Sequence, residues 1–356
     1  MSGSKRALVT GACGFVAGYV IEALLKNGWE VKATDLKTAN KASLEKFGEK
    51  VPFSPSDVTD KDSLKLVVKD VDIVFHTAAI FDFSTPIEIL RAVNVQGTRN
   101  VIEVSMDADV KKMVCWSSTA VYGQADPKWY KIPITEDQEL NPMIKNRYDL
   151  SKREQEEAAL TYYNENNFPV TLVRCNPIYG PGSYYGMYVI FYYTKIGALP
   201  AMPRNLHNYH MPIVHIEDIA GAALYLSDVK NYNGEAYNIT DDNDLDTLET
   251  ARYVAFLTGS RLKVLLPVAL KPLRPLLRLL GKMSLWEAKH LRKKVNGKPP
   301  VPKLETETFE YLYGKYWFSN EKLKATGYKL KYPDRRIGLI KTIDWYDEHG
   351  WEPLHH

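Results

Sequence analysis

The sequence predicts an α/β protein built on a doubly wound parallel sheet, and three observations lead to this prediction. Short apolar runs alternate with longer stretches of helical periodicity over the first half of the chain. A glycine-rich turn, Gly11–Gly14, follows the first apolar run. The composition, with 45% hydrophobic and 25% charged residues, is typical of a globular protein with a sizeable core. Strands that alternate with helices are joined by right-handed crossovers and therefore lie parallel.

The expected elements alternate regularly up to residue 175. The first strand is Ala7–Thr10, and the helix after it, Val16–Leu25, ends at a natural cap, Asn27-Gly28. Further strands are expected at Glu30–Thr34, Val71–His76, Lys112–Ser117 and Pro169–Arg174, and long helices at Ile87–Asp107 and Tyr148–Asn166. We therefore assign residues 1–175 to the domain that contains the sheet.

The alternation weakens after Asn176. A strand-like Ile213–His215, a helix near Leu245–Leu257 and a basic, apolar segment, Lys263–Lys294, are the main features there. We assign residues 176–356 mainly to a smaller region that completes a pocket, and we expect some of its segments to return to the first domain.

Charge and cysteine content exclude several classes of protein. The 46 basic and 43 acidic residues give a net charge of +3, so nothing in the composition points to nucleic acid. Cys13, Cys115 and Cys175 lie far apart and match no metal-binding spacing, so we expect buried thiols, no metal site and a cytoplasmic protein. We expect no signal peptide, because the N-terminus has no apolar leader segment, and no spanning helix, because every apolar run is shorter than about 18 residues.

The glycine-rich turn has the form of a phosphate-binding loop. Glycines at a strand-to-helix junction let the backbone approach a pyrophosphate, and the helix N-terminus behind them offers unpaired N–H groups. The residues expected at the dinucleotide are Gly11, Cys13, Gly14, Phe15 and Val16. The alternative is a tight turn without a ligand, which the order strand, turn, amphipathic helix, strand and acid disfavours.

The acid at the end of the second strand indicates which dinucleotide binds. The carboxylate of Asp35 would accept hydrogen bonds from both adenine-ribose hydroxyls and repel a 2′-phosphate, which favours NAD over NADP. The neighbouring Lys37 weakens this preference, because a nearby cation tolerates a phosphate.

Tyr148 and Lys152 form the strongest candidate catalytic pair. They lie one helical turn apart, so their side chains share a face. An ammonium and an oxidised nicotinamide both favour the phenolate, so we expect a lowered pKa for Tyr148 and general acid/base chemistry near neutral pH. A solvated pair on a charged helix is the alternative. The hydroxyl-rich Ser117–Tyr122 favours the catalytic interpretation, because it follows an apolar strand whose end would face the ligand crevice, although such turns are common.

Further short motifs accompany these residues in order along the chain. They are Gly11–Ala17, Asp57-Val58, His76–Ala79, Asn94–Thr98, Ser117–Gly123, Thr135-Glu136, Tyr148–Lys152, Arg174–Gly182, His215–Asp218 and Thr326–Tyr328. Together they resemble the extended short-chain dehydrogenase/reductase family, in its epimerase/dehydratase branch, and the resemblance implies a Rossmann-type fold. Ala17 stands where many members have a glycine, and alanine is small enough for the same helix–strand packing.

The resemblance implies a role for each matching residue. Tyr148 would be the general acid/base, Lys152 would bind the nicotinamide ribose, and Ser118 would hydrogen-bond the reacting oxygen, with Ser117 as the second choice. Asp57 and Val58 would contact adenine, Ala78 would line the cleft, and Asn94 would support the strand ends. The cofactor-binding set that it implies is Gly11, Cys13, Gly14, Phe15, Val16, Asp35, Asp57, Val58, Ala78, Ala79, Asn94, Ser117, Tyr148, Lys152, Asn176 and Pro177. A homodimer is also expected.

Two features favour an apolar substrate. Aromatic residues crowd Tyr184–Tyr193, and Phe81 and Phe83 follow the strand whose end faces the cleft. Core packing is the alternative for Tyr184–Tyr193, since several of its tyrosines share a helical face.

The second feature is Lys263–Lys294, which contains nine basic residues and one acid, Glu287. Four cations share one helical face and four leucines the other, namely Lys271, Arg274, Arg278 and Lys282 against Leu273, Leu276, Leu277 and Leu280. The segment is either a lid over the pocket or an amphipathic helix at a membrane surface. The second interpretation resembles the 3β-hydroxysteroid dehydrogenase-like branch.

The sequence thus predicts an NAD-dependent oxidoreductase that interconverts a secondary alcohol and a ketone on a steroid-like or other lipid substrate. A nucleotide-sugar epimerase or dehydratase is the alternative, in which Arg204 and the basic segment would hold the diphosphate. A cofactor-binding scaffold without catalysis is disfavoured, because Ser118, Tyr148 and Lys152 are all present.

Overall fold

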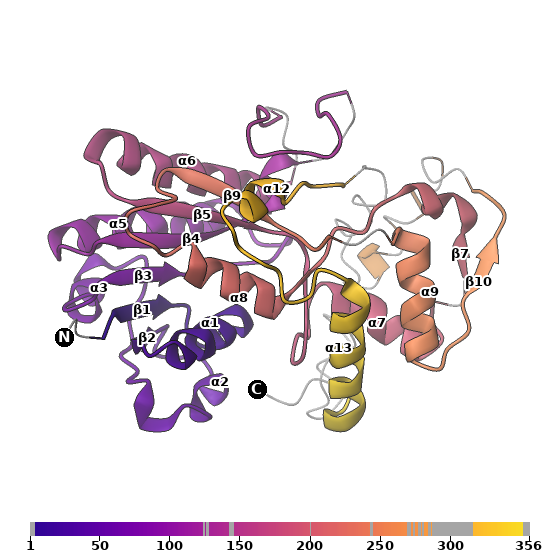
Figure 1. Ribbon diagram of the computed structural model, residues 1–356, viewed down its shortest axis with the longest axis horizontal. Coiled ribbons are helices and arrows are strands. Elements are labelled where there is room, and N and C mark those ends of the chain that lie inside the picture. The colour runs from indigo at the N-terminus through magenta and orange to yellow at the C-terminus, as the bar shows by residue number, and fades with distance from the viewer. Residues whose placement is uncertain are drawn as a thin grey trace.

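A computed structural model gives the fold of the chain. It describes residues 4–123, 125, 128–141, 146–199, 201–242, 245–268, 272, 275, 276, 279, 281–283, 286 and 316–351. The sheet and its helices lie side by side with a smaller group of helices and short strands (Figure 1).

A six-stranded parallel sheet forms the centre of the larger part (Figure 1). Its order is β2-β1-β3-β4-β5-β9. The strands are β1 (Arg6–Thr10), β2 (Glu30–Thr34), β3 (Ile73–His76), β4 (Lys112–Ser118), β5 (Val170–Cys175) and β9 (Glu235–Ile239). Every neighbouring pair is parallel. The predicted doubly wound sheet is confirmed, and the chain reverses its direction across the sheet between β1 and β3, where such folds bind ligands.

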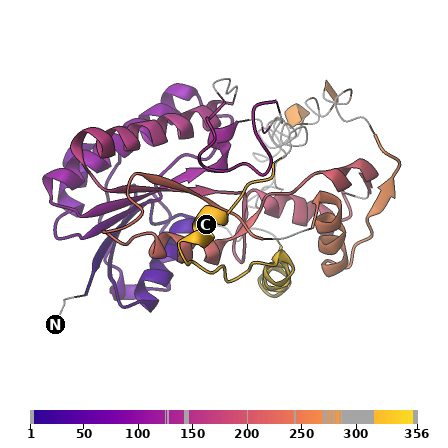
Figure 2. The same ribbon diagram turned by 45° about the horizontal axis from the view of Figure 1, so that its top comes forward.

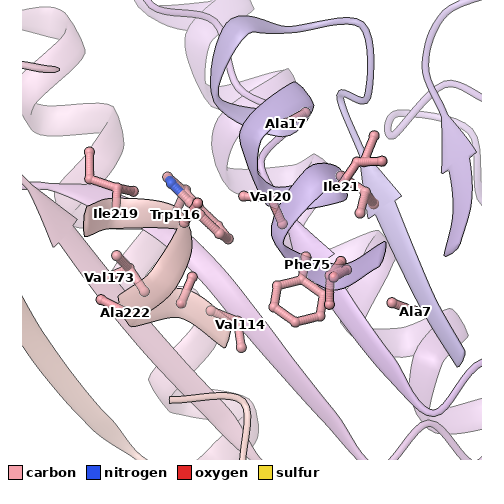
Figure 3. Close-up of a cluster of buried hydrophobic side chains, with 14 of the residues drawn as sticks. Ala7, Ala17, Val20, Ile21, Phe75, Val114, Trp116, Val173, Ile219 and Ala222 are labelled. Atoms are coloured by element: carbon pink, nitrogen blue, oxygen red, sulfur yellow. The ribbon is translucent and has the colours of Figure 1, made fainter. Parts of the chain in front are cut away.

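Helices cover both faces of this sheet (Figures 1 and 2). One face carries α1 (Phe15–Lys26) and α8 (Ile216–Tyr225), and the other carries α3 (Lys61–Val67), α5 (Gly97–Asp107) and α6 (Arg147–Asn166). Figure 3 shows the first of the two cores, in which Val20 of α1 and Ile219 of α8 lie over Phe75 and Trp116 of the sheet. The buried strands are apolar on both faces, which is why they appear in the sequence as continuous apolar runs.

The predicted helix Ile87–Asp107 consists of three pieces. An α-helical turn, α4 (Ile87–Leu90), leads into the π-helical turn η2 (Arg91–Gln96) and then into α5. Periodicity alone does not separate these pieces. The π turn surrounds Asn94, a fully buried residue whose side chain is hydrogen-bonded outside the helix.

The smaller part is built on short elements. They are β6 (Ile178–Tyr179), α7 (Met187–Lys195), β7 (Ala201–Pro203), η4 (Arg204–Asn208), β8 (Val214–His215), α9 (Thr247–Leu257), β10 (Lys263–Leu265), α12 (Glu321–Ala325) and α13 (Arg335–His349). Strand β6 pairs with β8, and β7 pairs with β10.

The aromatic stretch Tyr184–Tyr193 is mainly part of the core of this region. Tyr188 and Phe191 are 1% exposed, and the Tyr188 ring packs 5.2 Å from that of Tyr346 on α13. Tyr185, at 71% exposure, is the exception. The packing alternative therefore applies to most of this stretch, because α13, which is distant in sequence, covers it.

The amphipathic pattern in Lys263–Lys294 falls mostly outside the described residues. Of the eight residues that define its two faces, Leu276 and Lys282 are described, and both are exposed. Within the part of the chain that the structure describes, no helix is both long enough and apolar enough to cross a bilayer.

Candidate active site

The glycine-rich loop lies against the segment that follows β3. Gly11 has a φ of +63°, and a Cβ atom built on it would come within 2.7 Å of the Ala78 Cα. Glycine is therefore required here on two grounds, its left-handed backbone and the close approach of Ala78. The structure thus brings Ala78, and with it the chain that leads to Ala79, to the loop.

The N-terminus of α1 is available to an anion. Its N-cap residue, Gly14, provides no side-chain cap, and the first turn contains no acidic residue. The N–H groups at the start of a helix have no partner within the helix, and the helix dipole adds partial positive charge there. Phe15 and Val16, the first residues of α1, therefore belong to a backbone donor set that suits a pyrophosphate.

Asp35 is fixed beside this loop. Its carboxylate accepts hydrogen bonds from the Cys13 N–H at 2.9 Å and from the Leu36 N–H at 2.7 Å, which leaves lone pairs for further donors. The Asp35 carbonyl accepts the Ser56 N–H, so the segment leading to Asp57 and Val58 lies alongside. Lys37 is exposed. Loop, helix terminus and carboxylate together fit a dinucleotide.

Tyr148 and Lys152 lie in the first turns of α6. Asn146 caps this helix by accepting the N–H groups of Tyr148 and Asp149. Tyr148 is 7% exposed and Lys152 is 1% exposed, so the pair is not a solvated surface pair. The Lys152 ammonium donates to the Trp116 carbonyl at 2.6 Å, which anchors it to β4. Burial lowers the pKa of Lys152.

Two phenylalanines enclose the Tyr148 ring. Phe81 and Phe83 meet it edge to face, with ring centroids 4.9 and 5.6 Å away. Burial is the main reason that the pKa of Tyr148 is raised well above its usual value, and the charge of Asp149 adds to this effect. The protein alone therefore shifts this pKa upward, opposite to the predicted direction, because desolvation outweighs any influence of Lys152. A bound oxidised nicotinamide would act in the other direction.

Polar groups without partners lie at the ends of β4 and β5. Ser118 lies close enough to the Tyr148 phenol to oppose the rise of its pKa, and the Ser118 Oγ accepts the Ala120 N–H at 3.1 Å. Among the described residues, the buried Ser117 hydroxyl has no partner, and neither amide atom of Asn176 has one although this residue is 1% exposed. A buried amide without hydrogen bonds is costly, and such groups mark places where a ligand binds. The carbonyl of the next residue, Pro177, accepts the N–H of Val214 in β8.

A buried polar network beneath the site was not predicted. His76 is fully buried between Thr10 and Thr98, with both ring nitrogens 2.9 Å from their hydroxyls. Burial lowers its pKa to about 3, so the ring is neutral. Gln155 of α6 donates to the same Thr98 hydroxyl, and Thr98 donates to the Asn94 carbonyl. The motif His76–Ala79 marked this position in the sequence, but the residues that hydrogen-bond His76 lie far from it along the chain.

Comparisons with known proteins agree with this geometry. Residues 7–240 match the model of the NAD dependent epimerase/dehydratase family. A UDP-N-acetyl-alpha-D-glucosaminuronate decarboxylase of Bacillus cytotoxicus is 29% identical over 73% of this chain and 82% of its own. A sterol-4-alpha-carboxylate 3-dehydrogenase, decarboxylating, of Bos taurus is 29% identical over 68% of this chain and 67% of its own. The dTDP-glucose 4,6-dehydratase of Bacillus anthracis, solved in complex with NAD, superposes with a TM-score of 0.71 at 19% identity over 97% of each chain, which shows the shared fold.

Proposed function

This chain belongs to the NAD-dependent epimerase/dehydratase family and is an NAD-dependent enzyme, and we propose that it interconverts a secondary alcohol and a ketone on a steroid-like or other lipid substrate. NAD, when bound, supplies the hydride acceptor or donor. The remaining chemistry belongs to the side chains at the carboxyl ends of β4 and β5 and at the start of α6.

We assign the proton transfer to Tyr148. During reduction its phenol gives a proton to the oxygen that becomes the alcohol, and during oxidation its phenolate takes that proton back. Ser118, which lies beside the Tyr148 phenol, holds the same oxygen. Lys152, fixed by the Trp116 carbonyl, lies one helical turn from Tyr148 and binds the nicotinamide ribose. Asn176, whose buried amide has no partner within the described part of the chain, contacts the cofactor.

The observation that carries the substrate proposal is the apolar environment of Tyr148. Five apolar residues pack with it, namely Ile80, Phe83, Ile87, Leu90 and Ala120. Phe81 adds a second ring, and it remains 51% exposed beside the reacting group. A large exposed phenylalanine at this place has little value for stability and suits contact with a hydrocarbon skeleton.

A nucleotide-sugar enzyme is the second candidate, because relatives such as the decarboxylase of Bacillus cytotoxicus act on such compounds by name. It requires cations for the diphosphate, and Arg204 is exposed in η4. A dehydratase also requires a second acid/base beside Tyr148 to remove water. The apolar residues that pack around Tyr148 cannot act in that role.

A substrate panel tests this proposal. NADH absorbance is followed with 3β-hydroxysteroids, other apolar secondary alcohols, and UDP- and dTDP-sugars side by side, and epimerised or dehydrated sugar products are assayed separately. We expect NADH from the apolar alcohols, with Phe81→Ala lowering kcat/KM for them about tenfold. Turnover of the sugars alone would overturn the lipid proposal and favour the second candidate.

We further propose that the protein is a cytoplasmic homodimer whose sheet domain ends near residue 175, and that Lys263–Lys294 is either a lid over the pocket or a peripheral membrane contact. Each cation near an anionic surface contributes about 1 kcal/mol to binding. Membrane contact predicts cosedimentation of the wild type with anionic vesicles at low salt. It should weaken when the four cations Lys271, Arg274, Arg278 and Lys282 are replaced by Gln. Absence of wild-type binding leaves the lid interpretation.

A further inference from the structure

The side chain of Trp116 holds a buried donor that finds no acceptor in the described part of the chain. Trp116 lies in β4 and is 6% exposed, and its Nε1 atom is buried without a hydrogen-bond partner there. An indole N–H can only donate, so the group cannot be satisfied by accepting a hydrogen bond instead. A buried donor without an acceptor is costly, and it indicates that a ligand, an ion or a water binds at this place.

The register of the sheet puts Trp116 at the level of the glycine-rich loop. Thr10, the last residue of β1, pairs with His76 of β3, and His76 pairs with Cys115 of β4. Trp116 is therefore one residue further along β4, at the level at which the chain leaves β1 through Gly11. Ligands of such sheets bind outside the carboxyl ends of the strands, where the chain reverses its direction across the sheet. Trp116 thus belongs to the edge of the sheet that receives the cofactor.

The Trp116 ring leaves the sheet on the face that α1 and α8 cover. Figure 3 shows it between Val20 of α1 and Ile219 of α8. In this view both helices begin toward the top, and the indole nitrogen lies at the upper end of the ring. The N-terminus of α1, which has no side-chain cap and no acid in its first turn, lies at that end. The Trp116 N–H is therefore directed toward the side on which the backbone donors of α1 suit a pyrophosphate.

The main chain of Trp116 is tied to the active site as well. Its carbonyl accepts the Lys152 ammonium at 2.6 Å, and Lys152 is the residue that we assign to the nicotinamide ribose. Two residues further along β4 lies Ser118, beside the Tyr148 phenol. Trp116 therefore lies next to the groups assigned to the nicotinamide half of the cofactor, while its ring extends toward the helix whose N-terminus suits the diphosphate.

We propose that Trp116 donates its indole N–H to an oxygen atom of the bound dinucleotide. The diphosphate, the ribose hydroxyls and the nicotinamide carboxamide all carry oxygens that accept hydrogen bonds. The ring is fixed in the core, so little side-chain entropy is lost when NAD binds. This inference concerns NAD binding alone, and its tests need no substrate, so failure of the substrate proposal leaves them unaffected.

Indole resonances test the contact directly. The chain contains seven tryptophans, so isotope-labelled protein gives seven indole N–H signals, and the signal that is missing from Trp116→Phe identifies Trp116. We expect saturating NAD to move the Trp116 signal downfield, which is the direction that a new hydrogen bond produces. A Trp116 signal that stays unchanged under saturating NAD would overturn the proposal and leave a water as the partner of this donor.

NAD affinity provides a second test. Replacing Trp116 by benzothienylalanine puts sulfur in the place of the N–H and keeps the shape of the ring. We expect the NAD dissociation constant to rise at least about fivefold, which corresponds to about 1 kcal/mol, the usual contribution of one hydrogen bond. The unfolding midpoint without NAD should stay constant or rise, because a buried donor without an acceptor has been removed. A purely structural role of the indole would instead lower the midpoint and leave the NAD affinity unchanged.

Trp29→Phe is the control for the loss of a buried indole. Trp29 is 9% exposed in the same core, beside Phe75, and it directly precedes β2, at the edge of the sheet opposite the cofactor. Trp116→Phe should weaken NAD binding at least about fivefold, and Trp29→Phe by less than about twofold. Equal losses in the two variants would overturn the proposal, because both would then reflect a packing defect. If Trp116→Phe does not fold, the benzothienylalanine protein supplies both the missing signal and the affinity.

ADP-ribose separates the possible acceptors, because it carries the diphosphate and both riboses but no nicotinamide. If the benzothienylalanine protein binds ADP-ribose and NAD with the same loss of affinity, the acceptor is a diphosphate or ribose oxygen. A loss for NAD alone places the acceptor on the carboxamide. Unchanged affinity for both compounds contradicts the proposal.

Discussion

Replacing Tyr148 by phenylalanine removes the proposed proton carrier and leaves its ring in place. The Ser118 hydroxyl is the side-chain group close enough to the Tyr148 phenol to favour its ionised form. A single hydrogen bond of this kind contributes about 1 kcal/mol, so the unfolding midpoint should fall by only about 2 °C. General acid/base catalysis is worth about 100-fold or more, or at least about 2.7 kcal/mol of transition-state stabilisation. The activation free energy should therefore rise by more than the free energy of unfolding falls.

The assay is the initial rate of NADH formation, together with a titration of NAD binding. We expect turnover at least about 100-fold below wild type and an NAD affinity within about twofold. Tyr179→Phe is the control, because Tyr179 is also buried and its hydroxyl donates to the Arg335 carbonyl outside the site. Near-normal turnover in Tyr148→Phe, or an equal loss in Tyr179→Phe, would refute the reasoning.

Three further predictions concern cofactor choice, the unpartnered amide and acid stability. Asp35→Ala should weaken NAD binding and relieve repulsion of a 2′-phosphate, so the dissociation constant of NAD divided by that of NADP should rise. A wild-type enzyme that binds NADP much more tightly than NAD would contradict the role of Asp35. Asn176→Ala removes a buried amide that has no partner in the part of the chain that the structure describes, so the unfolding midpoint should stay constant or rise. At the same time kcat/KM should fall at least about tenfold, and an unchanged kcat/KM would refute the contact between Asn176 and the cofactor. His76 and His215 are buried with pKa values lowered by burial from 6.5 to about 3, so the unfolded chain binds more protons below about pH 6.5 and stability falls as the pH drops toward 3. At pH 5 each histidine lowers the free energy of unfolding by about 2 kcal/mol. His215→Asn can still cap α8, so the fall in the free energy of unfolding between pH 7 and pH 5, measured in urea, should be about 2 kcal/mol smaller than in wild type. An undiminished fall would rule out His215 as a cause.

Local patterns were sufficient for five of the six strands of the sheet, whereas β9 (Glu235–Ile239) was not predicted. Strand β2 was predicted at its observed bounds, and α1 and α6 within a residue at each end, because apolar periodicity and caps are local features. The one-turn spacing of Tyr148 and Lys152 placed both side chains on the buried side of one helix.

Contacts between distant segments account for what the sequence did not reveal. The direction of the Tyr148 pKa depends on Phe81 and Phe83, which come from a loop far upstream. The packing of Tyr188 depends on α13, near the other end of the chain. The partners of Asn94 are Ile80 and Ser151, and no spacing rule joins three such positions.

Transfer of deuterium from substrate carbon to NAD tests the central claim most directly. An apolar secondary alcohol, labelled with deuterium at the carbinol carbon, is incubated with the enzyme and NAD, and the NADH formed is examined by mass spectrometry. The account predicts one deuterium per NADH and a ketone without label, with both products lost in Tyr148→Phe. Failure of every apolar alcohol to label NADH, while labelled nucleotide sugars react, would contradict it.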